Sequence, residues 1–334
     1  MTDAATIAAP GATMRAITYD RYGSPDVLRL SEVPVPSVAD GNLLVRVGAT
    51  SVNALDWHML RGKPYVARLS AGLTKPKKPI PCVDVAGTVV AVGSEVTGFA
   101  VGDRVFANKG RAAAEYVSGP ASLFVPMPSN LSMEEAAAIP AAGITALQAI
   151  RDRGLLQAGQ SVLVHGAGGG VGTFSVQIAK ALGGEVTGVT RTENLELVRS
   201  IGADRVVDYS ASDVTRSGER YDLVIDNGAT RPLLSMRRLL KPSGRLVTVG
   251  ASRGAFIGPV VRIVAGGVVS RFGGPAMIGF FAEPKREDLL VLKDLAESGA
   301  LTSVIDRTYP LRKTAEALAY LETMRARGKV VVTI

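Results

Sequence analysis

A hydrophobic run that ends in a cluster of glycines, SVLVHGAGGGVG at residues 161–172, places the strongest constraint on the fold. The run SVLVH is typical of a buried strand, and the following VGTFSVQIAKALG is typical of a helix. A strand, a tight glycine turn and a helix in succession present a helix N-terminus at the carboxyl end of a parallel sheet. The segment therefore predicts an α/β fold whose glycine turn can hold an anionic group.

The glycines follow the register AxGxxG, with Ala167, Gly169 and Gly172. In a dinucleotide-binding turn the first position allows the tight turn, the middle one lets a phosphate approach the backbone, and the last lets helix and strand pack closely. A flexible turn without a ligand is the alternative, but the strand and helix predicted on either side favour a pyrophosphate cradle. We expect its contacts to come from Gly166, Ala167, Gly168, Gly169, Gly170, Val171 and Gly172.

The end of the second strand indicates which dinucleotide is bound. A carboxylate there would hold the ribose 2′-hydroxyl of NAD, whereas this chain has Thr190 followed by Arg191. A guanidinium at this place favours the 2′-phosphate of NADPH, with Asn194 and Tyr209 adding neutral hydrogen bonds. The nearby Glu193 weakens the case for NADPH, and its alternative role is that of an acid in the first turn of a helix. The alternative for Arg191 is a solvated surface cation.

The pattern of apolar segments changes along the chain and indicates two domains. Up to about residue 125 the apolar segments are short and separated by Gly and Pro, which is typical of strands joined by turns. From about residue 132 strand-like and helical stretches alternate, which indicates βαβ units, and the final KVVVTI is expected to rejoin the first domain. We predict a disordered tail over residues 1–13, a β-rich domain over 14–131 and 284–334, and a doubly wound parallel-sheet domain over 132–283.

Composition restricts the classes of function. The 334 residues, 47% hydrophobic and 20% charged, are enough for two globular domains of an enzyme. The one cysteine, Cys82, excludes an internal disulfide and a multi-cysteine metal site and is compatible with the cytoplasm. The net charge of +8 comes from scattered basic residues without interleaved aromatics, which argues against a nucleic-acid partner.

No segment has the features of a secretion signal or of an integral membrane span. The longest apolar stretch, around residues 254–279, is interrupted by Arg262, Arg271 and several Gly and Pro residues. Three roles are open for it: it lines the substrate site, forms a subunit contact, or makes a weak peripheral contact with a membrane surface that supplies a lipid quinone.

Four segments together resemble a known family: VLVHGAGGGVGTFSVQIAKALG, LVRSIGADRVVDY, VNALDWHMLRG and the closing ARGKVVVTI. They are similar to the zinc-independent quinone oxidoreductase branch of the medium-chain dehydrogenase/reductase superfamily. The resemblance implies a GroES-like β-rich catalytic domain completed by the C-terminal strands, a Rossmann domain, and an active site in the cleft between them. It also implies a homodimer paired through the Rossmann edge strand.

The same resemblance allows the metal ligands to be compared. Alcohol dehydrogenases of this superfamily bind catalytic zinc through a Cys, a His and an acid or second Cys, and this chain has Asn53 and Val83 at two of those places. Asp84 alone keeps the acidic position, and one carboxylate makes no zinc site. Of the two histidines, His58 and His165, the second is expected to order the glycine turn. We therefore expect no metal.

Without a Lewis acid the substrate must itself be a good hydride acceptor, such as a quinone or an activated alkene. The resemblance places Asn53 and Asp56 beside the nicotinamide and the acceptor, and His58, Tyr65 or solvent delivers a proton. The structural alternatives are that Asp56 caps a helix starting at Trp57 and that Tyr65 packs in a loop.

Further cofactor contacts are expected at strand ends, because ligands of open α/β sheets bind outside the carboxyl ends of the strands. They fall on Asn227, Gly250 and Ala251, while the resemblance adds Thr145 and Lys329. A surface lysine before an edge strand is the alternative for Lys329. The resulting prediction is an NADPH-dependent quinone reductase, with an enone or 2-enal reductase as the alternative within enzymes and an NADPH-binding sensor as the alternative outside them.

Overall fold

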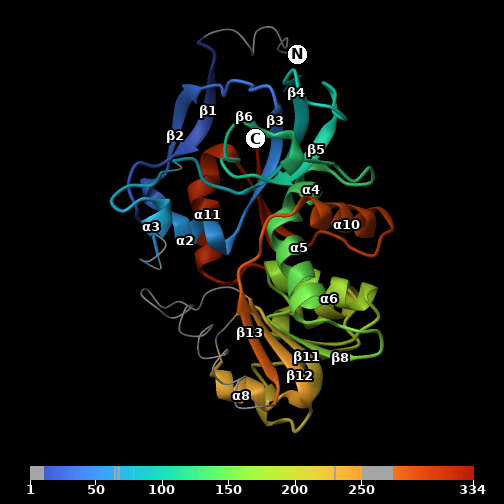
Figure 1. The fold of residues 1–334 in the computed structure, drawn as a ribbon. Coiled ribbons are helices and arrows are strands. Elements are labelled where there is room, and N and C mark those ends of the chain that lie inside the picture. Colours follow the sequence, from blue (N-terminus) through green and yellow to red (C-terminus); the bar gives the residue numbers. More distant parts are fainter. Residues whose placement is uncertain (1–10, 64, 66–67, 78, 229–230, 250–273) are drawn as a thin grey trace. The chain divides into compact units, whose positions relative to one another are not determined.

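The computed structural model describes residues 11–63, 65, 68–77, 79–228, 231–249 and 274–334 (Figure 1). The chain divides into two compact units, one made of residues 1–141, 284–297 and 305–334 and the other of residues 142–283 and 298–304. Of the apolar stretch 254–279, residues 254–273 lie outside the described residues, as do Gly250 and Ala251. In the part of the chain that is described, no helix has the length and hydropathy needed to cross a membrane.

The predicted tail over residues 1–13 is too long by one residue, because the first strand begins at Thr13. The division also differs from the predicted domain limits at two places. Helix α4 (Met133–Ala138) packs on strands β3 and β4 of the first unit, so the change of unit falls after Ala141. Residues 298–304 belong to the second unit, where the Gln177 side chain donates to the Thr302 carbonyl at 3.0 Å and accepts from the Thr302 amide at 2.7 Å. Both differences arise from tertiary contacts, which the local sequence pattern does not predict.

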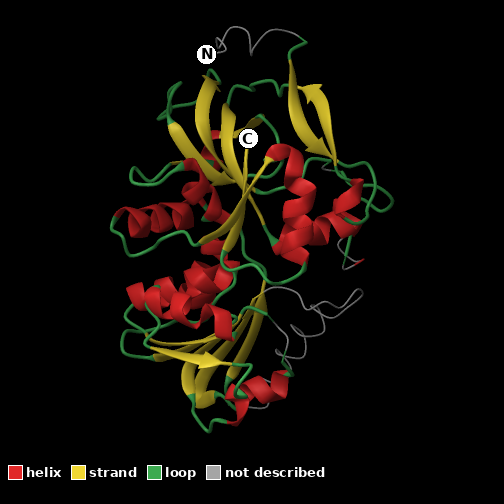
Figure 2. Ribbon diagram, turned by 180° about the vertical axis from the view of Figure 1, so that it is seen from behind, coloured by secondary structure: helices red, strands yellow, loops and turns green. Residues whose placement is uncertain are grey.

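The first unit is built on a seven-stranded sheet of order β14-β15-β3-β4-β5-β7, with β6 also paired to β3, and on a two-stranded sheet, β1-β2 (Figure 2). Its strands are β1 (Thr13–Thr18), β2 (Arg29–Pro34), β3 (Asn42–Val52), β4 (Asp84–Val92), β5 (Arg104–Asn108), β6 (Tyr116–Pro120), β7 (Val125–Pro126), β14 (Ile305–Pro310) and β15 (Lys329–Thr333). Its helices are α2 (Ala54–Arg61), α3 (Arg68–Ala71), α4, α10 (Arg286–Glu297) and α11 (Thr314–Glu322), and α5 (Pro140–Leu147) starts here and continues into the second unit.

The C-terminal strand completes this sheet, as the sequence predicts. Strand β15 runs antiparallel to β3, with Val330 opposite Val52. Its valines 330–332 are fully buried, because the strand lies inside the sheet and both of its faces are covered. This register brings the first residue of β15, Lys329, beside the residue that follows β3, Asn53.

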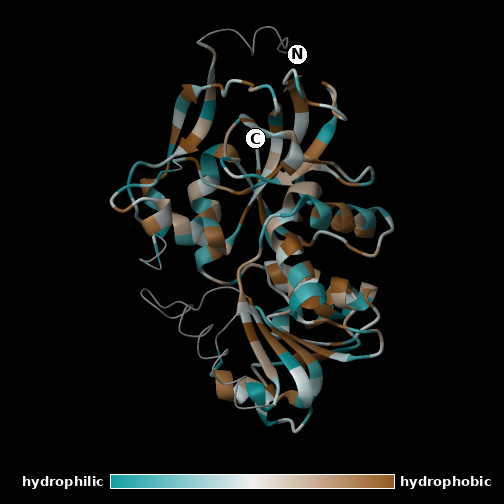
Figure 3. Cartoon of the chain, in the orientation of Figure 1, coloured by the Kyte–Doolittle hydropathy of each residue, from teal (hydrophilic) through white to brown (hydrophobic). Residues whose placement is uncertain are grey.

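Helix α10 shows how the sequence pattern fixes a packing face. Its buried residues Asp288, Leu289, Leu292 and Ala296 recur at helical spacing, and Figure 3 shows hydrophobic and hydrophilic residues alternating along it. Near its end, the Asn130 side chain donates to the Ala296 carbonyl at 2.9 Å. The helix is therefore attached to the first unit by one apolar face and a polar contact at its C-terminus.

The second unit is a six-stranded parallel sheet of order β10-β9-β8-β11-β12-β13. Its strands are β8 (Ser161–His165), β9 (Glu185–Thr190), β10 (Arg205–Asp208), β11 (Tyr221–Asp226), β12 (Leu240–Val249) and β13 (Ala276–Phe280), and its helices are α6 (Gly170–Ala181), α7 (Leu195–Ser200) and α8 (Leu233–Arg237). The chain passes from β8 outward to β10 and then returns to β11 on the other side of β8. The strand order therefore reverses beside β8, which is where open α/β sheets bind ligands.

Helix limits differ from the sequence expectation between residues 132 and 153. The stretch MEEAAAIPAAGITALQAI at residues 133–150, whose pattern is typical of a helix, is divided into α4, α5, which begins at Pro140, and a π-helical segment, Gln148–Arg153. Proline has no amide hydrogen to donate and is accepted at the first position of a helix, so Pro140 starts a new helix where it cannot continue the old one.

Candidate active site

The glycine turn of the second unit has the geometry that a phosphate-binding turn needs. Gly166 follows β8 with a φ of +77°, and the amides of Gly166 and Ala167 both donate to the Val189 carbonyl at 3.0 Å. Gly169 is the N-cap of α6, in extended backbone. The chain thus reverses from strand to helix within a few residues and leaves the first amides of α6 at the carboxyl edge of the sheet.

The three positions of the AxGxxG register differ in the space around them. A Cβ at Gly172 would lie 2.1 Å from the Gly166 carbonyl oxygen and 2.8 Å from Ala167 backbone atoms, so this glycine permits the close approach of helix and turn. Among the described residues, a Cβ at Gly169 would meet only the Gly166 oxygen, at 3.5 Å, which is ordinary contact. Space beside Gly169 is open to a ligand, whereas space beside Gly172 is filled by the protein.

Two asparagines near this turn have buried polar atoms without a hydrogen-bond partner among the described residues: Oδ1 of Asn194 and both amide atoms of Asn227. Asn194 reaches the turn, since its Nδ2 lies 2.5 Å from where a Cβ of Gly168 would be. Asn227 follows β11, with its Cβ 3.6 Å from the corresponding point at Gly166. Buried amides left unpaired are costly, so these groups fit a polar ligand that supplies the missing bonds. The turn and its two asparagines therefore fit a dinucleotide.

The end of β9 carries the residues predicted to select the cofactor. Thr190 is buried and Arg191 half-buried, and the amide of the 43%-exposed Tyr209 donates to the Thr190 carbonyl at 3.0 Å. Sequence reasoning missed Asp208, which ends β10 opposite Thr190 and places a carboxylate in this region. Its oxygens accept from the Thr192 hydroxyl at 2.6 Å and the Ser210 amide at 2.8 Å, and these bonds lower the pKa of Asp208. The carboxylate is thus engaged by the turn that follows β9 and by its own loop after β10.

His165 ends β8 directly before the turn. Its Nδ1 lies 3.1 Å from Oδ1 of Asp226, and both side chains are buried. The backbone N–H of Asn227 donates to the His165 carbonyl at 3.1 Å. This bond and the His165–Asp226 pair connect the ends of β8 and β11. These contacts agree with the expectation that His165 orders the turn; Asp226 was not foreseen as its partner.

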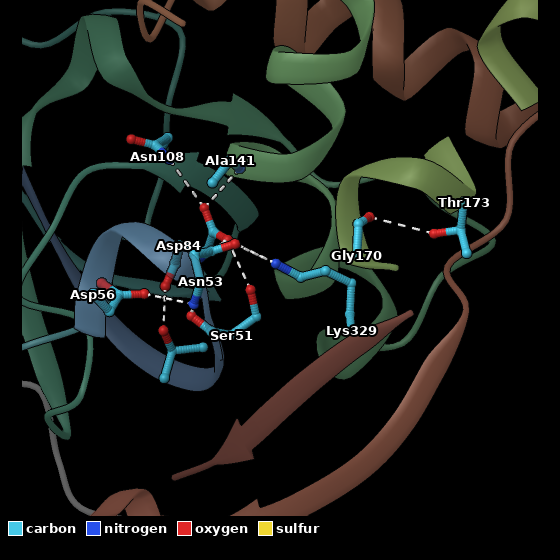
Figure 4. Close-up of polar contacts among 10 residues, drawn as sticks. Ser51, Asn53, Asp56, Asp84, Asn108, Ala141, Gly170, Thr173 and Lys329 are labelled. Carbon is cyan, nitrogen blue, oxygen red and sulfur yellow. Dashed lines mark hydrogen bonds and ion pairs between the residues drawn. The ribbon is translucent and has the colours of Figure 1, made fainter. Parts of the chain in front are cut away.

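A second group of polar side chains is centred on Asp84, at the start of β4 in the first unit (Figure 4). The carboxylate is fully buried and accepts four hydrogen bonds. The donors are the Ser51 hydroxyl at 2.7 Å and Asn53 Nδ2 at 2.8 Å on Oδ2, and Asn108 Nδ2 at 3.1 Å and the Ala141 amide at 2.8 Å on Oδ1. Both oxygens are therefore satisfied, as a buried charge requires.

Lys329 completes this group with a buried ammonium. Its Nζ donates to Oδ1 of Asn53 at 2.5 Å and lies 3.7 Å from Oδ2 of Asp84, and the residue is 3% exposed. Burial lowers the pKa of Lys329, while the charges of Asp84 and Asp56 oppose that change. Lys329 is thus a buried, paired cation and not the surface lysine considered as its alternative.

Helix α2 begins at Ala54 with Asn53 as its N-cap, three residues before the start considered at Trp57. Asp56 is the third helical residue, and its carboxylate accepts a hydrogen bond from the backbone N–H of Asn53 at 2.7 Å. This bond is one half of a capping box. Asp56 does cap the helix, but from within its first turn. Burial and the neighbouring charge of Asp84 raise the pKa of Asp56 to about 7.

The raised pKa of Asp56 predicts a pH-dependent stability. Between its ordinary pKa of 3.8 and about 7, the folded protein holds a proton that the unfolded chain has released, so the contribution of Asp56 to stability falls as pH rises. Asp56→Asn keeps the acceptor for the Asn53 amide and removes the titration. In urea denaturation, the wild type should therefore lose stability relative to this variant from pH 4 to pH 7, by at most about 4 kcal/mol.

The control for this measurement is the exposed Asp20→Asn, whose stability should follow that of the wild type across the same range. Parallel curves for the wild type and Asp56→Asn would contradict the raised pKa.

The two candidate proton donors lie in different surroundings. His58 is half-buried on α2, stacks on Trp57 with ring centroids 3.8 Å apart, and has its Nδ1 3.1 Å from the Lys63 carbonyl. Burial lowers the pKa of His58, which keeps the ring neutral. Tyr65 is 38% exposed, and the Arg68 guanidinium lies 4.9 Å from its ring centroid.

The structure thus brings the predicted site residues into two groups, one in each unit. Asn53, Asp56 and Lys329 meet around Asp84 in the first unit. The turn residues, with Thr190, Asn194 and Asn227, lie at the carboxyl edge of the sheet in the second. Thr145 is half-buried on α5. Ser51, Asn108 and Asp208 are polar members that sequence reasoning missed.

A zinc ion does not fit the group around Asp84. Val83 offers no donor, and the Lys329 ammonium already contacts both Asn53 Oδ1 and Asp84, where it would repel a second cation. Among the residues that the structure describes, no three His, Cys, Asp or Glu side chains lie close enough together to hold a metal ion.

Comparisons with known proteins agree with this architecture. Two family models match, the alcohol dehydrogenase GroES-like domain over residues 39–169 and the zinc-binding dehydrogenase model over residues 201–332. A chloroplast quinone oxidoreductase of Triphysaria versicolor is 33% identical, over 96% of this chain and 99% of its own. A chloroplast NADPH-dependent alkenal/one oxidoreductase of Arabidopsis thaliana is also 33% identical, over 96% of this chain and 79% of its own. The solved quinone oxidoreductase of Coxiella burnetii has a TM-score of 0.84 and 29% identity, covering 97% of this chain and all of that one.

A GroES-like unit followed by a Rossmann unit with a dinucleotide turn defines an oxidoreductase that uses a nicotinamide cofactor. Within that class the chain belongs to the quinone oxidoreductase branch of the medium-chain dehydrogenase/reductase superfamily.

Proposed function

We propose that this chain is an NADPH-dependent reductase that transfers hydride to a quinone or another activated acceptor without a metal ion. The observation that carries the proposal is the glycine turn, beside which Oδ1 of Asn194 and both side-chain amide atoms of Asn227 are buried without a hydrogen-bond partner among the described residues, because this arrangement fits a polar ligand such as a dinucleotide. When bound, NADPH supplies the hydride. The printed functions of the relatives, quinone and alkenal/one reduction, support an activated acceptor.

In this proposal the residues of the second unit bind and orient the cofactor. The amides that begin α6 receive the pyrophosphate, and the asparagine amides complete its polar shell. The Arg191 guanidinium holds the 2′-phosphate with help from Thr190 and Tyr209, because Asp208, the nearby acid, is already engaged by Thr192 and Ser210.

The group around Asp84 serves the acceptor. Of the two amide hydrogens on Asn53 Nδ2, one is donated to Asp84 at 2.8 Å, and the contact with the Ser51 carbonyl is long, at 3.4 Å. We assign the second hydrogen, whose hydrogen bond to Ser51 is the weaker of the two, to the oxygen on which negative charge develops after hydride transfer. The proton that completes the reduction comes from solvent, from His58 or from Tyr65.

Turnover against a panel of acceptors tests this function. EDTA-treated protein is incubated with NADPH or NADH and with an ortho-quinone, a 2-enal or an unactivated ketone. We expect oxidation of NADPH with an activated acceptor and none with the ketone, because no Lewis acid polarises the ketone. The faster of the quinone and the 2-enal decides between quinone reductase and alkene reductase.

Two results would overturn the proposal. Ketone turnover that zinc restores would contradict the metal-free mechanism. Tight NADPH binding without turnover on any acceptor would favour the alternative, an NADPH-binding sensor.

The same panel tests cofactor choice through Arg191→Gln. Loss of a charge-assisted bond to the 2′-phosphate should weaken NADPH binding by about 10- to 100-fold and leave NADH binding unchanged. Arg199→Gln, an exposed arginine on α7, is the matched control and should bind both cofactors as the wild type does. An equal loss of affinity for NADPH and NADH would show that Arg191 does not bind the 2′-phosphate.

The homodimer and the cytoplasmic location stay predictions.

A further inference from the structure

Asn53 is held in one orientation by opposite charges on its two amide atoms. Its Oδ1 accepts from the Lys329 ammonium and its Nδ2 donates to the Asp84 carboxylate. If the amide were flipped, its NH₂ group would face the ammonium and its oxygen would face the carboxylate, and both contacts would be repulsive. The two charges therefore fix which way the amide hydrogens point.

The same ammonium faces two buried carboxylates. Asp84 and Asp56 are 0% and 4% exposed, and Lys329, at 3%, is the cation that contacts this group among the described residues. Removing one partner of a buried ion pair leaves an uncompensated charge, which is strongly destabilising. Lys329 thus has two separable effects, one on the orientation of Asn53 and one on the stability of the charge on Asp84.

We propose that Lys329 is a positioning residue for the reduction: its ammonium holds the Asn53 carboxamide so that an amide hydrogen faces the oxygen of the acceptor. The inference rests on the proposed function, in which Asn53 binds that oxygen. The role differs from the cofactor contact that the resemblance predicts for Lys329, since it acts through Asn53 and Asp84 in the first unit, and the cofactor contact stays a prediction.

Lys329→Met is the primary test. We expect kcat with the best acceptor of the panel to fall about 100-fold, because a misplaced polar group forfeits much of its effect on the transition state. The Kd for NADPH, measured by fluorescence titration, should stay at the wild-type value. Lys293→Met, which removes a lysine paired with Glu297 on α10, is the matched control and should keep the wild-type kcat.

Two double variants separate positioning from charge balance. In Asp84→Asn/Lys329→Met both charges are removed, so the melting temperature should recover relative to Lys329→Met while kcat stays low. In an Asn53→Ala background, Lys329→Met should lower kcat little further, because its effect acts through Asn53. If the single variant fails to fold, the neutral double variant carries the measurement.

Each contrary result has a distinct meaning. Recovery of the wild-type kcat in Asp84→Asn/Lys329→Met would show that Lys329 only balances charge, and would overturn the inference. A rise in the Kd for NADPH equal to the fall in kcat would make Lys329 a cofactor ligand instead. A wild type that is inactive on every acceptor contradicts the proposed function and the inference together, whereas an active wild type with an active Lys329→Met contradicts the inference alone.

Discussion

Gly169→Ala is expected to leave the protein folded and to weaken the binding of both NADPH and NADH by about 100-fold, or about 3 kcal/mol. The backbone at Gly169 is extended, with a φ of −90°, so alanine meets no strain there. Its Cβ would have one contact within 4 Å in the described part of the chain, with the Gly166 oxygen at 3.5 Å. That space lies at the start of α6, where the pyrophosphate must approach the backbone, so the methyl group takes up room that the ligand needs.

Cofactor fluorescence titration and thermal unfolding measure the two halves of this expectation. Gly41→Ala, where a Cβ meets nothing within 4 Å and φ is ordinary, is the matched control for adding a methyl group, and should change neither quantity. Wild-type affinity in Gly169→Ala would mean that the turn is not the phosphate cradle. Lower affinity accompanied by a large fall in melting temperature would assign the loss to misfolding.

The alternation of strands and helices in the second unit could be predicted because it is written in local patterns. Runs such as SVLVH are buried on both sides of a parallel sheet and are therefore apolar throughout, and the glycine cluster marks the turn into α6. The order of the six strands could be expected only from the family resemblance, since the return from β10 to β11 beside β8 is a tertiary event.

The start of α2 had a signal that could have been used. Asn53 followed three residues later by Asp56 is a variant of the capping-box pattern, in which the cap residue precedes the helix and the acid lies in its first turn. A helix that started at Trp57 would have Asp56 as its N-cap residue, whereas the observed helix has Asn53 in that position. The carboxyl group of Asp56 is buried in the first turn of α2, and this burial together with the charge of Asp84 raises its pKa.

The contact of Lys329 with Asn53 had no local signal. The two residues are 276 positions apart and meet only because β15 pairs with β3 in a particular register. The sequence offered a lysine before a valine-rich strand, which is equally compatible with an exposed edge. A pairing shifted by one residue would have turned Lys329 to the opposite face of the sheet. Asp208 had no local signal for a similar reason, because it comes beside Thr190 only through the pairing of β10 with β9.

Gly172→Ala is expected to have the opposite outcome to Gly169→Ala, with a loss of folding stability in place of a loss of affinity alone. Its Cβ would lie 2.1 Å from the Gly166 carbonyl oxygen and 2.8 Å from the Ala167 backbone. Both neighbours are main-chain atoms of the turn, so no side-chain rotation relieves the clash, and α6 must move away from the end of β8. Overpacking of this kind costs about 3 kcal/mol, which lowers the melting temperature by about 6–12 °C.

Thermal unfolding of Gly172→Ala beside Gly169→Ala, without cofactor, compares these costs directly. The two substitutions add the same methyl group three residues apart, so a difference between them reports the space around each glycine and not the chemistry of alanine. A melting temperature of Gly172→Ala equal to that of the wild type would contradict the close packing of α6 on the turn. If the melting temperatures of both variants are lower than that of the wild type, the protein fills the space beside Gly169 that we assign to the cofactor.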